Sequence, residues 1–304
     1  MINVFICTYN PIQDILKRTV DAVLAQDLDQ KLWDFTIIDN NSTTPVSEID
    51  FVKALNINVV IEKTPGLTAA RKCAAITATQ DIIVFVDDDN ILQKNYLTVM
   101  LDIFNNNDIG IVSGNVYPEY QQQPEEWFYP FEEMVAIRKV QSDKLVINEK
   151  VVFNEIFPIG AGMGIRKKIL EDYFLLHLAA AEKIEGRKGN DLSSCEDLDI
   201  DFYALSSGYK MGVSPLLQLT HIIPANRVSV NYISRLAASC MKSNYQVNNK
   251  WRPVFNINVF PVFDRPYFKL VLKMLYYKLL SANNNYYKIE YITLKNIIKY
   301  KLKG

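Results

Sequence analysis

The first hundred residues alternate between short apolar segments and segments with helical spacing, which constrains the fold more than any other feature. The expected strands are short and rich in Val, Ile and Phe: 3–8, 35–38, 58–61 and 82–86. The expected helices carry apolar residues every three or four positions: 12–24, 67–77 and 94–104. Strands that alternate with helices predict an α/β fold, with a mostly parallel sheet covered by helices on both faces.

Polar residues follow three of the predicted strands, at 8–10, 39–42 and 87–90. We expect Asn10 to cap the first helix, with Pro11 in its first turn. Ligands of open α/β sheets bind beyond the carboxyl ends of the strands. The sequence therefore predicts a binding site where these polar segments meet.

Bulk composition excludes several classes of protein. With 304 residues, of which 49% are hydrophobic, the chain can bury a sizeable core. The net charge of -1 gives no reason to expect nucleic acid as a partner. The four cysteines form no CxxC pair, which argues against a zinc ribbon and a disulfide framework. No apolar run reaches the roughly 18–20 residues that span a bilayer, and no signal peptide is recognisable. We expect a cytoplasmic protein.

Three consecutive aspartates, Asp87, Asp88 and Asp89, directly follow the apolar segment IIVFV, with Asn90 after them. Adjacent carboxylates repel one another and lose hydration near a core, so a positive charge should offset them. A hard divalent cation that also binds substrate phosphates would do so. A solvated acidic turn before a helix is the alternative, because acids also stabilise helix N-termini.

A second acidic group lies in the segment Ser-Cys-Glu-Asp-Leu-Asp at 194–199. Ser194 is expected to cap a helix, and the four acids exceed what capping requires: Glu196, Asp197, Asp199 and Asp201. A carboxylate at a helix start that faces a cleft can act as a general base. His221 ends a strand-like segment, where a structural role and a ligand role both remain open.

Gly66 directly precedes the helix predicted at 67–77, and Arg71 lies near the start of that helix. Backbone N–H groups at a helix start and a guanidinium can bind an anion. An exposed basic helix turn is an equally good interpretation of these two residues.

Taken together, these residues resemble the inverting, family-2-type glycosyltransferases with the GT-A fold, a Rossmann-like α/β fold. The similarity runs in order over about residues 1–225: the CTYN segment at 7–10, IDNNS at 38–42, the Gly66 to Arg71 segment, the cluster at 87–90, GAGMGIR at 160–166, the Glu196–Asp197 pair and Thr220–His221. The resemblance implies a catalytic and nucleotide-sugar-binding domain at 1–225, followed by a helical, basic extension at 226–304.

The resemblance also implies roles on the donor side. The implied donor-binding residues are Thr8, Tyr9, Asn10, Asp39, Asn41, Arg71, Asp87 and Asp88. Asp89 and His221 would hold Mn²⁺ or Mg²⁺. The donor would be a nucleotide-diphosphate sugar, with UDP-sugars expected from the family.

On the acceptor side, the resemblance implies that Asp197 is the catalytic base and that Glu196, Gly162 and Met163 contact the acceptor. The expected reaction moves the sugar to a hydroxyl of a saccharide or a lipid-linked saccharide, with inversion, in bacterial surface polysaccharide synthesis. A sugar nucleotidyltransferase is one alternative, although Cys-Thr-Tyr-Asn-Pro replaces the glycine-rich basic loop that such enzymes carry after the first strand. A non-catalytic carbohydrate-binding protein is the other.

The C-terminal segment 265–304 is basic and aromatic, with nine Lys or Arg and a single acid, Glu290. Such a segment can lie on an anionic membrane surface. It can equally pack on the domain or join two copies of the chain. The sequence therefore leaves open peripheral contact with the inner face of the cell membrane and a homo-oligomer.

Overall fold

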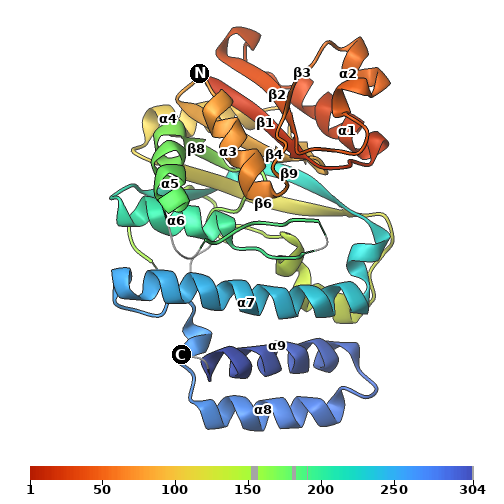
Figure 1. The fold of residues 1–304 in the computed structure, drawn as a ribbon, viewed down its shortest axis with the longest axis vertical. Coiled ribbons are helices and arrows are strands. Elements are labelled where there is room, and N and C mark those ends of the chain that lie inside the picture. The colour runs from red at the N-terminus through yellow and green to blue at the C-terminus, as the bar shows by residue number, and fades with distance from the viewer. Residues whose placement is uncertain (152–156, 180–182, 190, 303–304) are drawn as a thin grey trace.

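The computed structural model describes residues 1–151, 157–179, 183–189 and 191–302, and it is built around one sheet (Figure 1). In these residues the sheet has nine strands: β1 Ile2–Thr8, β2 Trp33–Asp39, β3 Asn58–Ile61, β4 Ile82–Asp87, β5 Asn90–Leu92, β6 Ile111–Tyr120, β7 Val146–Asn148, β8 Gly164–Arg166 and β9 Met211–Ile223. The strand order is β3-β2-β1-β4-β8-β6-β9-β5, and β7 pairs with β9.

The sheet is mostly parallel, as the sequence predicts. Strands β1 to β4 run in one direction. The short β8 is antiparallel to both β4 and β6, so β6 and its parallel neighbour β9 share that direction too. The short strands β5 and β7 pair antiparallel with β9. Strand β5 was not predicted, because its three residues are too few for a recognisable period of two.

The helices were largely predicted, and α3 has the expected bounds. The α-helices are α1 Gln13–Leu24, α2 Asp50–Ala54, α3 Leu67–Thr77, α4 Tyr96–Asn106, α5 Lys167–Ala179, α6 Glu196–Ser206, α7 Val230–Phe255, α8 Tyr267–Leu280 and α9 Asn285–Lys301. The 3₁₀-helices are η1 Gln30–Leu32, η2 Val46–Glu48, η3 Glu126–Val135, η4 Ala225–Val228 and η5 Pro261–Phe263.

Two cap predictions are wrong. Helix α1 begins at Gln13 with Ile12 at the N-cap, while Asn10 has a φ of 49° and accepts a hydrogen bond from the Thr43 N–H. Helix α6 is preceded by Cys195, not Ser194, at the N-cap. In both places the chain turns through the left-handed region, which local preference does not reveal.

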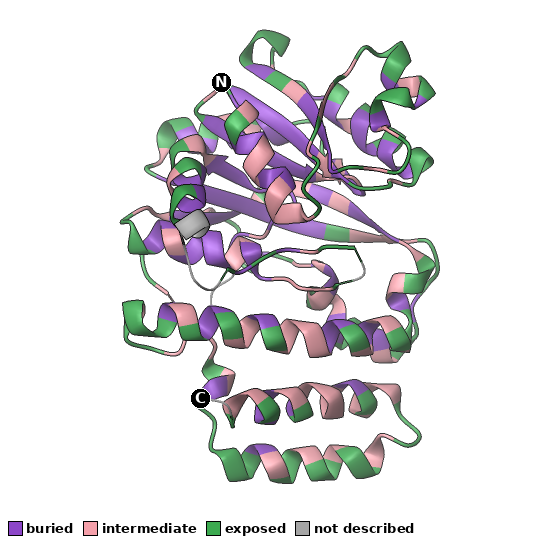
Figure 2. Ribbon diagram, viewed as in Figure 1, coloured by how far each residue is buried: buried purple, intermediate pink, exposed green. Residues whose placement is uncertain are grey.

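Side chains of the central strands alternate between two cores. In β1, Val4 and Ile6 join the cluster formed with α1 and α4, while Phe5 joins the cluster formed with α3, α5 and α6. Strand β4 divides in the same way, with Val84 in the first cluster and Phe85 in the second. Both faces of the sheet are therefore buried, as the purple strands of Figure 2 show.

Helix α7 connects the sheet to the C-terminal helices. It contributes Leu236 to the first core and Val247 and Trp251 to the second. Helix α9 packs on α7 and adds Ile289 to the first core. The helical part thus shares its core with the sheet, and the predicted boundary at residue 225 remains a prediction. None of the helices in the described part of the chain is long and apolar enough to span a membrane.

Candidate functional site

The aspartate cluster lies at the carboxyl end of β4, next to β1. The Thr8 hydroxyl donates a hydrogen bond to the Asp88 carboxylate, and the Thr19 hydroxyl donates to the Asp88 carbonyl over 3.1 Å. Burial and the charge of Asp89 raise the pKa of Asp88 to about 7, and the Thr8 bond opposes this shift. The cluster is thus held in the fold, and is not a solvated turn.

The fold places His221 beside Asp89, although 131 positions separate them in the sequence. Strand β5 pairs with β9 so that Asn90 lies opposite His221, and the Ile222 N–H donates to the Asp89 carbonyl over 2.9 Å. The Asp89 Oδ2 atom lies 3.2 Å from His221 Nε2, and both side chains are buried. The pairing of β5 with β9, which the sequence did not reveal, therefore assembles this pair.

Arg227, in η4, completes the group, and sequence reasoning missed it. Its Nη1 donates to Asp89 Oδ2 over 2.9 Å and lies 3.3 Å from His221 Nε2. Burial raises the pKa of Asp89, but the nearby His221 and Arg227 outweigh that effect and hold the pKa well below its usual range. A basic residue shortly after the histidine was the only available signal, and it fits many surface turns equally well.

These residues fit a divalent cation as a two-residue site. Two ligand atoms at right angles around an ion with bonds of about 2.1 Å lie about 3 Å apart, close to the 3.2 Å between Asp89 Oδ2 and His221 Nε2. Nowhere in the described residues do three His, Cys, Asp or Glu side chains form a metal-binding group. Remaining ligands would therefore come from phosphate and water, and Arg227 would have to move aside.

On the donor side, β1 and β2 bring their polar ends together. Thr8 is opposite Asp39 in the parallel register, and Tyr9, which follows Thr8, is 52% exposed. The two Asp39 carboxylate oxygens accept hydrogen bonds from the Ser42 and Val46 N–H groups over 2.9 Å each. Asp39 is 1% exposed and thereby shapes the loop after β2.

Asn10 and Asn41, the other predicted donor residues, are exposed in the loops after β1 and β2. The Asn10 N–H donates to the Ser42 hydroxyl over 2.9 Å, and Asn41 has a φ of 63°. The left-handed conformation of Asn41 is tolerated by asparagine better than by most residues. Both residues support the loop geometry beside Tyr9.

Arg71 is buried in α3 and pairs with Glu196 at the start of α6. Its Nη1 lies 3.4 Å from Glu196 Oε2, with side-chain exposures of 5% and 2%. The guanidinium also stacks 5.4 Å from the Phe85 ring centroid. Arg71 is therefore no exposed basic turn, which was the alternative interpretation of this segment.

Two glycines pack directly against this ion pair. A Cβ atom on Gly160 would lie 2.2 Å from an Arg71 guanidinium nitrogen, and one on Gly186 would lie 2.4 Å from Glu196 Oε2. Side chains at these positions would displace the buried charges. The close approach explains the glycine at 160 in physical terms.

Asp197 lies in the first turn of α6 and is half-buried. Its Oδ2 accepts a hydrogen bond from the Gly160 N–H over 3.1 Å, and its Oδ1 accepts from the Leu198 N–H over 3.0 Å. These two N–H donors fix the direction of the carboxylate. Asp197 is thus oriented by backbone donors and remains partly exposed.

The charges of Asp87, Glu196 and Asp197 all act on Arg71. Burial alone would lower the pKa of Arg71, but these three carboxylates raise it above its ordinary value. The end of β4 and the start of α6 therefore face one guanidinium. The structure thus brings the two acidic groups of the sequence near the same buried arginine.

Two predicted acceptor residues do not lie in this arrangement. Met163 is fully buried in the core beneath α3 and α5, and its carbonyl accepts a hydrogen bond from the Phe85 N–H. Gly162 is buried with a φ of 70°, and its carbonyl accepts from the Tyr96 hydroxyl over 2.7 Å. Their positions indicate packing, because neither offers a free group to a ligand.

Asp199 and Asp201 are also buried in the packed interior and do not face solvent. Asp199 is fully buried and accepts hydrogen bonds from Tyr173, Lys250 and Trp251. Asp201 is buried, and burial raises its pKa well above the ordinary value. Of the four acids near the start of α6, Asp197 is the one that is partly exposed.

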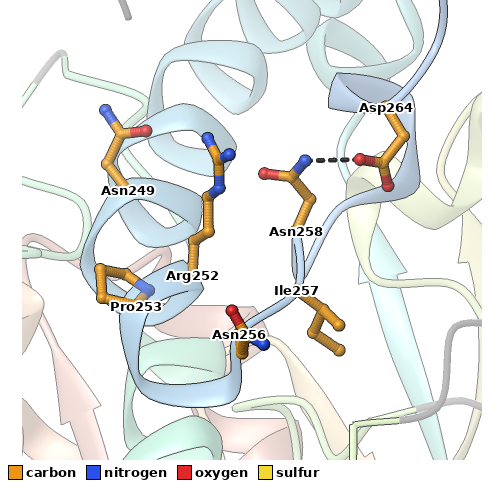
Figure 3. A pocket seen from close by; sticks show the side chains of 7 residues that line it. All are labelled: Asn249, Arg252, Pro253, Asn256, Ile257, Asn258 and Asp264. Carbon is orange, nitrogen blue, oxygen red and sulfur yellow. Dashed lines mark hydrogen bonds between the residues drawn. The ribbon is translucent and has the colours of Figure 1, made fainter.

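A hollow of about 660 Å³ lies elsewhere, at the end of α7 (Figure 3). It is lined by Asn249, Arg252, Pro253, Asn256, Ile257, Asn258 and Asp264. Asn258 Nδ2 donates to Asp264 Oδ1 over 2.6 Å across it. No residue of the sheet lines this hollow, so it is separate from the acidic groups.

Glu196 should make stability depend on pH. Burial raises its pKa from 4.5 to about 7, with Arg71 opposing the shift. The folded protein then binds more protons than the unfolded chain between these values, so the free energy of unfolding falls as pH rises through them. Glu196→Gln removes this loss. The free energy of unfolding of the variant, relative to that of the wild type, should therefore rise by about 3 kcal/mol between pH 4.5 and 7.

Urea unfolding at several pH values measures this difference. The matched control is Glu171→Gln, whose carboxylate also lies 3.4 Å from a cation, Lys167, but is exposed. The difference in free energy of unfolding between Glu171→Gln and the wild type should stay constant over this pH range. Parallel curves for wild type and Glu196→Gln would contradict the raised pKa.

Comparison with known proteins identifies the family. The model of "Glycosyl transferase family 2" matches residues 3–174, which is more than half of the chain. The chain belongs to glycosyl transferase family 2. This confirms the family inferred from the sequence, and the enzyme is a glycosyltransferase. A search of curated proteins finds no match.

Solved structures of S. aureus TarS have the same fold. The TarS 1-349 complex with UDP-GlcNAc has a TM-score of 0.56 and 13% identity, covering 99% of this glycosyltransferase and 90% of that chain. The complex with UDP has a TM-score of 0.55 at the same identity and coverage. A longer TarS structure has a TM-score of 0.53 and 14% identity, and 54% of that chain is covered. The predicted GT-A fold is confirmed.

Proposed function

We propose that this enzyme moves a sugar from a nucleotide-diphosphate donor, a UDP-sugar, to a hydroxyl of a saccharide or lipid-linked saccharide, with inversion. The observation that carries the proposal is the convergence of Asp87 and Asp197 on Arg71, with Asp89 and His221 in contact 3.2 Å apart at the same end of β4. UDP and UDP-GlcNAc in the TarS structures support the choice of donor.

Each end of the site has a distinct role in this proposal. Tyr9 is exposed for contact with the base, and Asp39 can accept a hydrogen bond from it. Arg227 is close enough to the Asp89–His221 pair to contact the diphosphate once it leaves Asp89. These contacts hold the leaving group on one side of the anomeric carbon.

Asp197 performs the proton transfer. The acceptor hydroxyl attacks the anomeric carbon opposite the diphosphate, and its proton goes to Asp197, while the bond to the diphosphate oxygen breaks. One displacement without a covalent intermediate inverts the configuration. Asp89 and His221 would hold Mn²⁺ or Mg²⁺, which supplies positive charge for the leaving diphosphate.

A variant that removes the Asp89 carboxylate tests the donor site. Asp89→Ala should abolish the Mn²⁺-dependent part of UDP-sugar binding, because it removes the carboxylate that contacts both His221 and Arg227. We expect at least a tenfold rise in the dissociation constant with Mn²⁺, measured by titration calorimetry. The control Asp102→Ala changes an exposed acid on α4 and should bind as the wild type does.

Two results would count against the proposal. The first is an Asp89→Ala variant that keeps the wild-type affinity and Mn²⁺ response. The second is a wild-type enzyme that binds no nucleotide sugar with or without Mn²⁺. Release of UDP from UDP-sugars in the presence of acceptor distinguishes transfer from the two alternatives, sugar nucleotidyltransfer and non-catalytic carbohydrate binding, and family membership favours transfer.

We further propose that the reaction serves the synthesis of a bacterial surface polysaccharide. The cytoplasmic location, contact with the inner face of the cell membrane and homo-oligomer formation stay predictions from the sequence. The structure offers one surface on which the last two can be tested.

A further inference from the structure

The outer face of α8 carries a continuous apolar stripe. Its members are all between 49% and 80% exposed: Phe268, Leu272, Leu275, Tyr276 and Leu279. Their spacings of four, three, one and three residues place them within an arc of about 100° on an α-helix. We call these five residues the α8 stripe.

The stripe faces away from the rest of the protein. The opposite side of α8 presents Leu270, Met274 and Tyr277 to a small core with Leu294 and Ile297 of α9. Figure 1 shows α8 as the outermost element, with α9 between it and α7, and Figure 2 shows its exposed positions. A surface helix normally has a polar outer face, so α8 is apolar where folding does not require it.

The surroundings of the stripe are basic. Arg265, Lys269 and Lys278 are exposed around it, and α8 contains no acid. In segment 265–304, nine Lys or Arg accompany a single acid, Glu290, which faces Lys273 at 4.0 Å. This part of the surface therefore attracts anions.

We propose that the α8 stripe docks on a membrane surface that contains anionic lipids. The leucines and aromatic rings enter the level of the headgroups, while the surrounding cations bind lipid phosphates. This inference does not depend on the transfer reaction, because it rests on α8 and the charges around it.

A second copy of the chain fits the stripe less well. A two-fold interface places the same patch against itself. Lys269 and Lys278 of one copy would then lie near those of the other, and α8 has no acid to neutralise them. An anionic bilayer meets both features of the surface, its apolar stripe and its positive charge.

Co-sedimentation of the full chain with vesicles tests the proposal. Vesicles of phosphatidylcholine with 30% phosphatidylglycerol should bind the wild type, and pure phosphatidylcholine vesicles should bind it much less. The variant Leu272→Ser/Leu275→Ser/Leu279→Ser should bind the anionic vesicles at least tenfold more weakly. Lys269→Gln/Lys278→Gln should also weaken binding, and should reduce its sensitivity to salt.

A matched control separates the stripe from general surface hydrophobicity. Leu175, Leu176 and Leu216 are exposed by 59% to 68%, on α5 and β9. Their triple serine variant should bind vesicles as the wild type does. Unchanged circular dichroism should show that each variant folds.

Three results would overturn the proposal. One is a wild type that binds neither kind of vesicle, and another is equal loss of binding in both triple variants. The third is a dimer of the wild type, seen by light scattering, that the α8 variant abolishes, since a second copy would then cover the stripe. Donor binding, measured separately, decides the proposed function, so failure of one proposal is distinguishable from failure of the other.

Discussion

Asp197→Asn is expected to lower the rate of sugar transfer by about 10²–10⁴-fold while the donor still binds. The amide cannot take the proton of the acceptor hydroxyl. It can still accept a hydrogen bond from the Gly160 N–H, which Asp197 Oδ2 accepts over 3.1 Å in the wild type. The substitution therefore removes the basic group and keeps the contact with Gly160, while the Leu198 N–H loses its acceptor Oδ1.

Two measurements separate these effects. UDP release with acceptor present gives the rate of transfer, and calorimetry gives the dissociation constant of the donor. The control Asp172→Asn makes the same chemical change in a carboxylate on the outer side of α5, where Lys168 pairs with it at 2.6 Å. Near-normal transfer by Asp197→Asn would refute its role as the base.

Asp199→Asn is expected to destabilise the fold by about 3 kcal/mol, the range for breaking a buried charge network from one side. Asp199 is fully buried and accepts hydrogen bonds from Tyr173, Lys250 and Trp251, at 2.7, 2.7 and 2.6 Å. An asparagine in its place would direct its own N–H donors toward these three donor groups. The contacts that join α6 to α5 and α7 would then weaken.

Urea unfolding measures this loss, and Asp172→Asn again serves as the control. Its ion pair with Lys168 is as short as that of Asp199 with Lys250, but it is exposed. Exposed pairs contribute about 0–1 kcal/mol, so the control should be nearly neutral. Equal losses in both variants would show that burial does not govern the strength of this network.

The two predictions concern neighbouring residues of α6 with different tasks. Asp197 is partly exposed, while Asp199 is fully buried and holds the helix that carries Asp197. Substitution of Asp199 should therefore act mainly on the stability of the fold. A sequence of four acids does not distinguish these tasks, because burial is a property of the packed helix.

Sequence reasoning succeeded where the information is local. The strands and helices of the first hundred residues follow from periods of two and 3.6, and the polar strand ends follow from the parallel order. It failed for Met163, a residue inside a matching motif whose side chain is packed in the core. A motif specifies residue types, but it does not specify which side chains face a ligand.

By itself, the sequence determined the family, the α/β fold and the proximity of the aspartates after β4 to the other strand ends. These depend on hydrophobic periodicity and on residue types within short segments. Only the tertiary structure decided that β5 pairs with β9 to place His221 and Arg227 beside Asp89, and that Arg71 faces Asp87, Glu196 and Asp197. The physical reason is that the contacts of Asp89 with His221 and of Arg71 with Glu196 join residues more than one hundred positions apart, whose distances depend on how the whole chain packs.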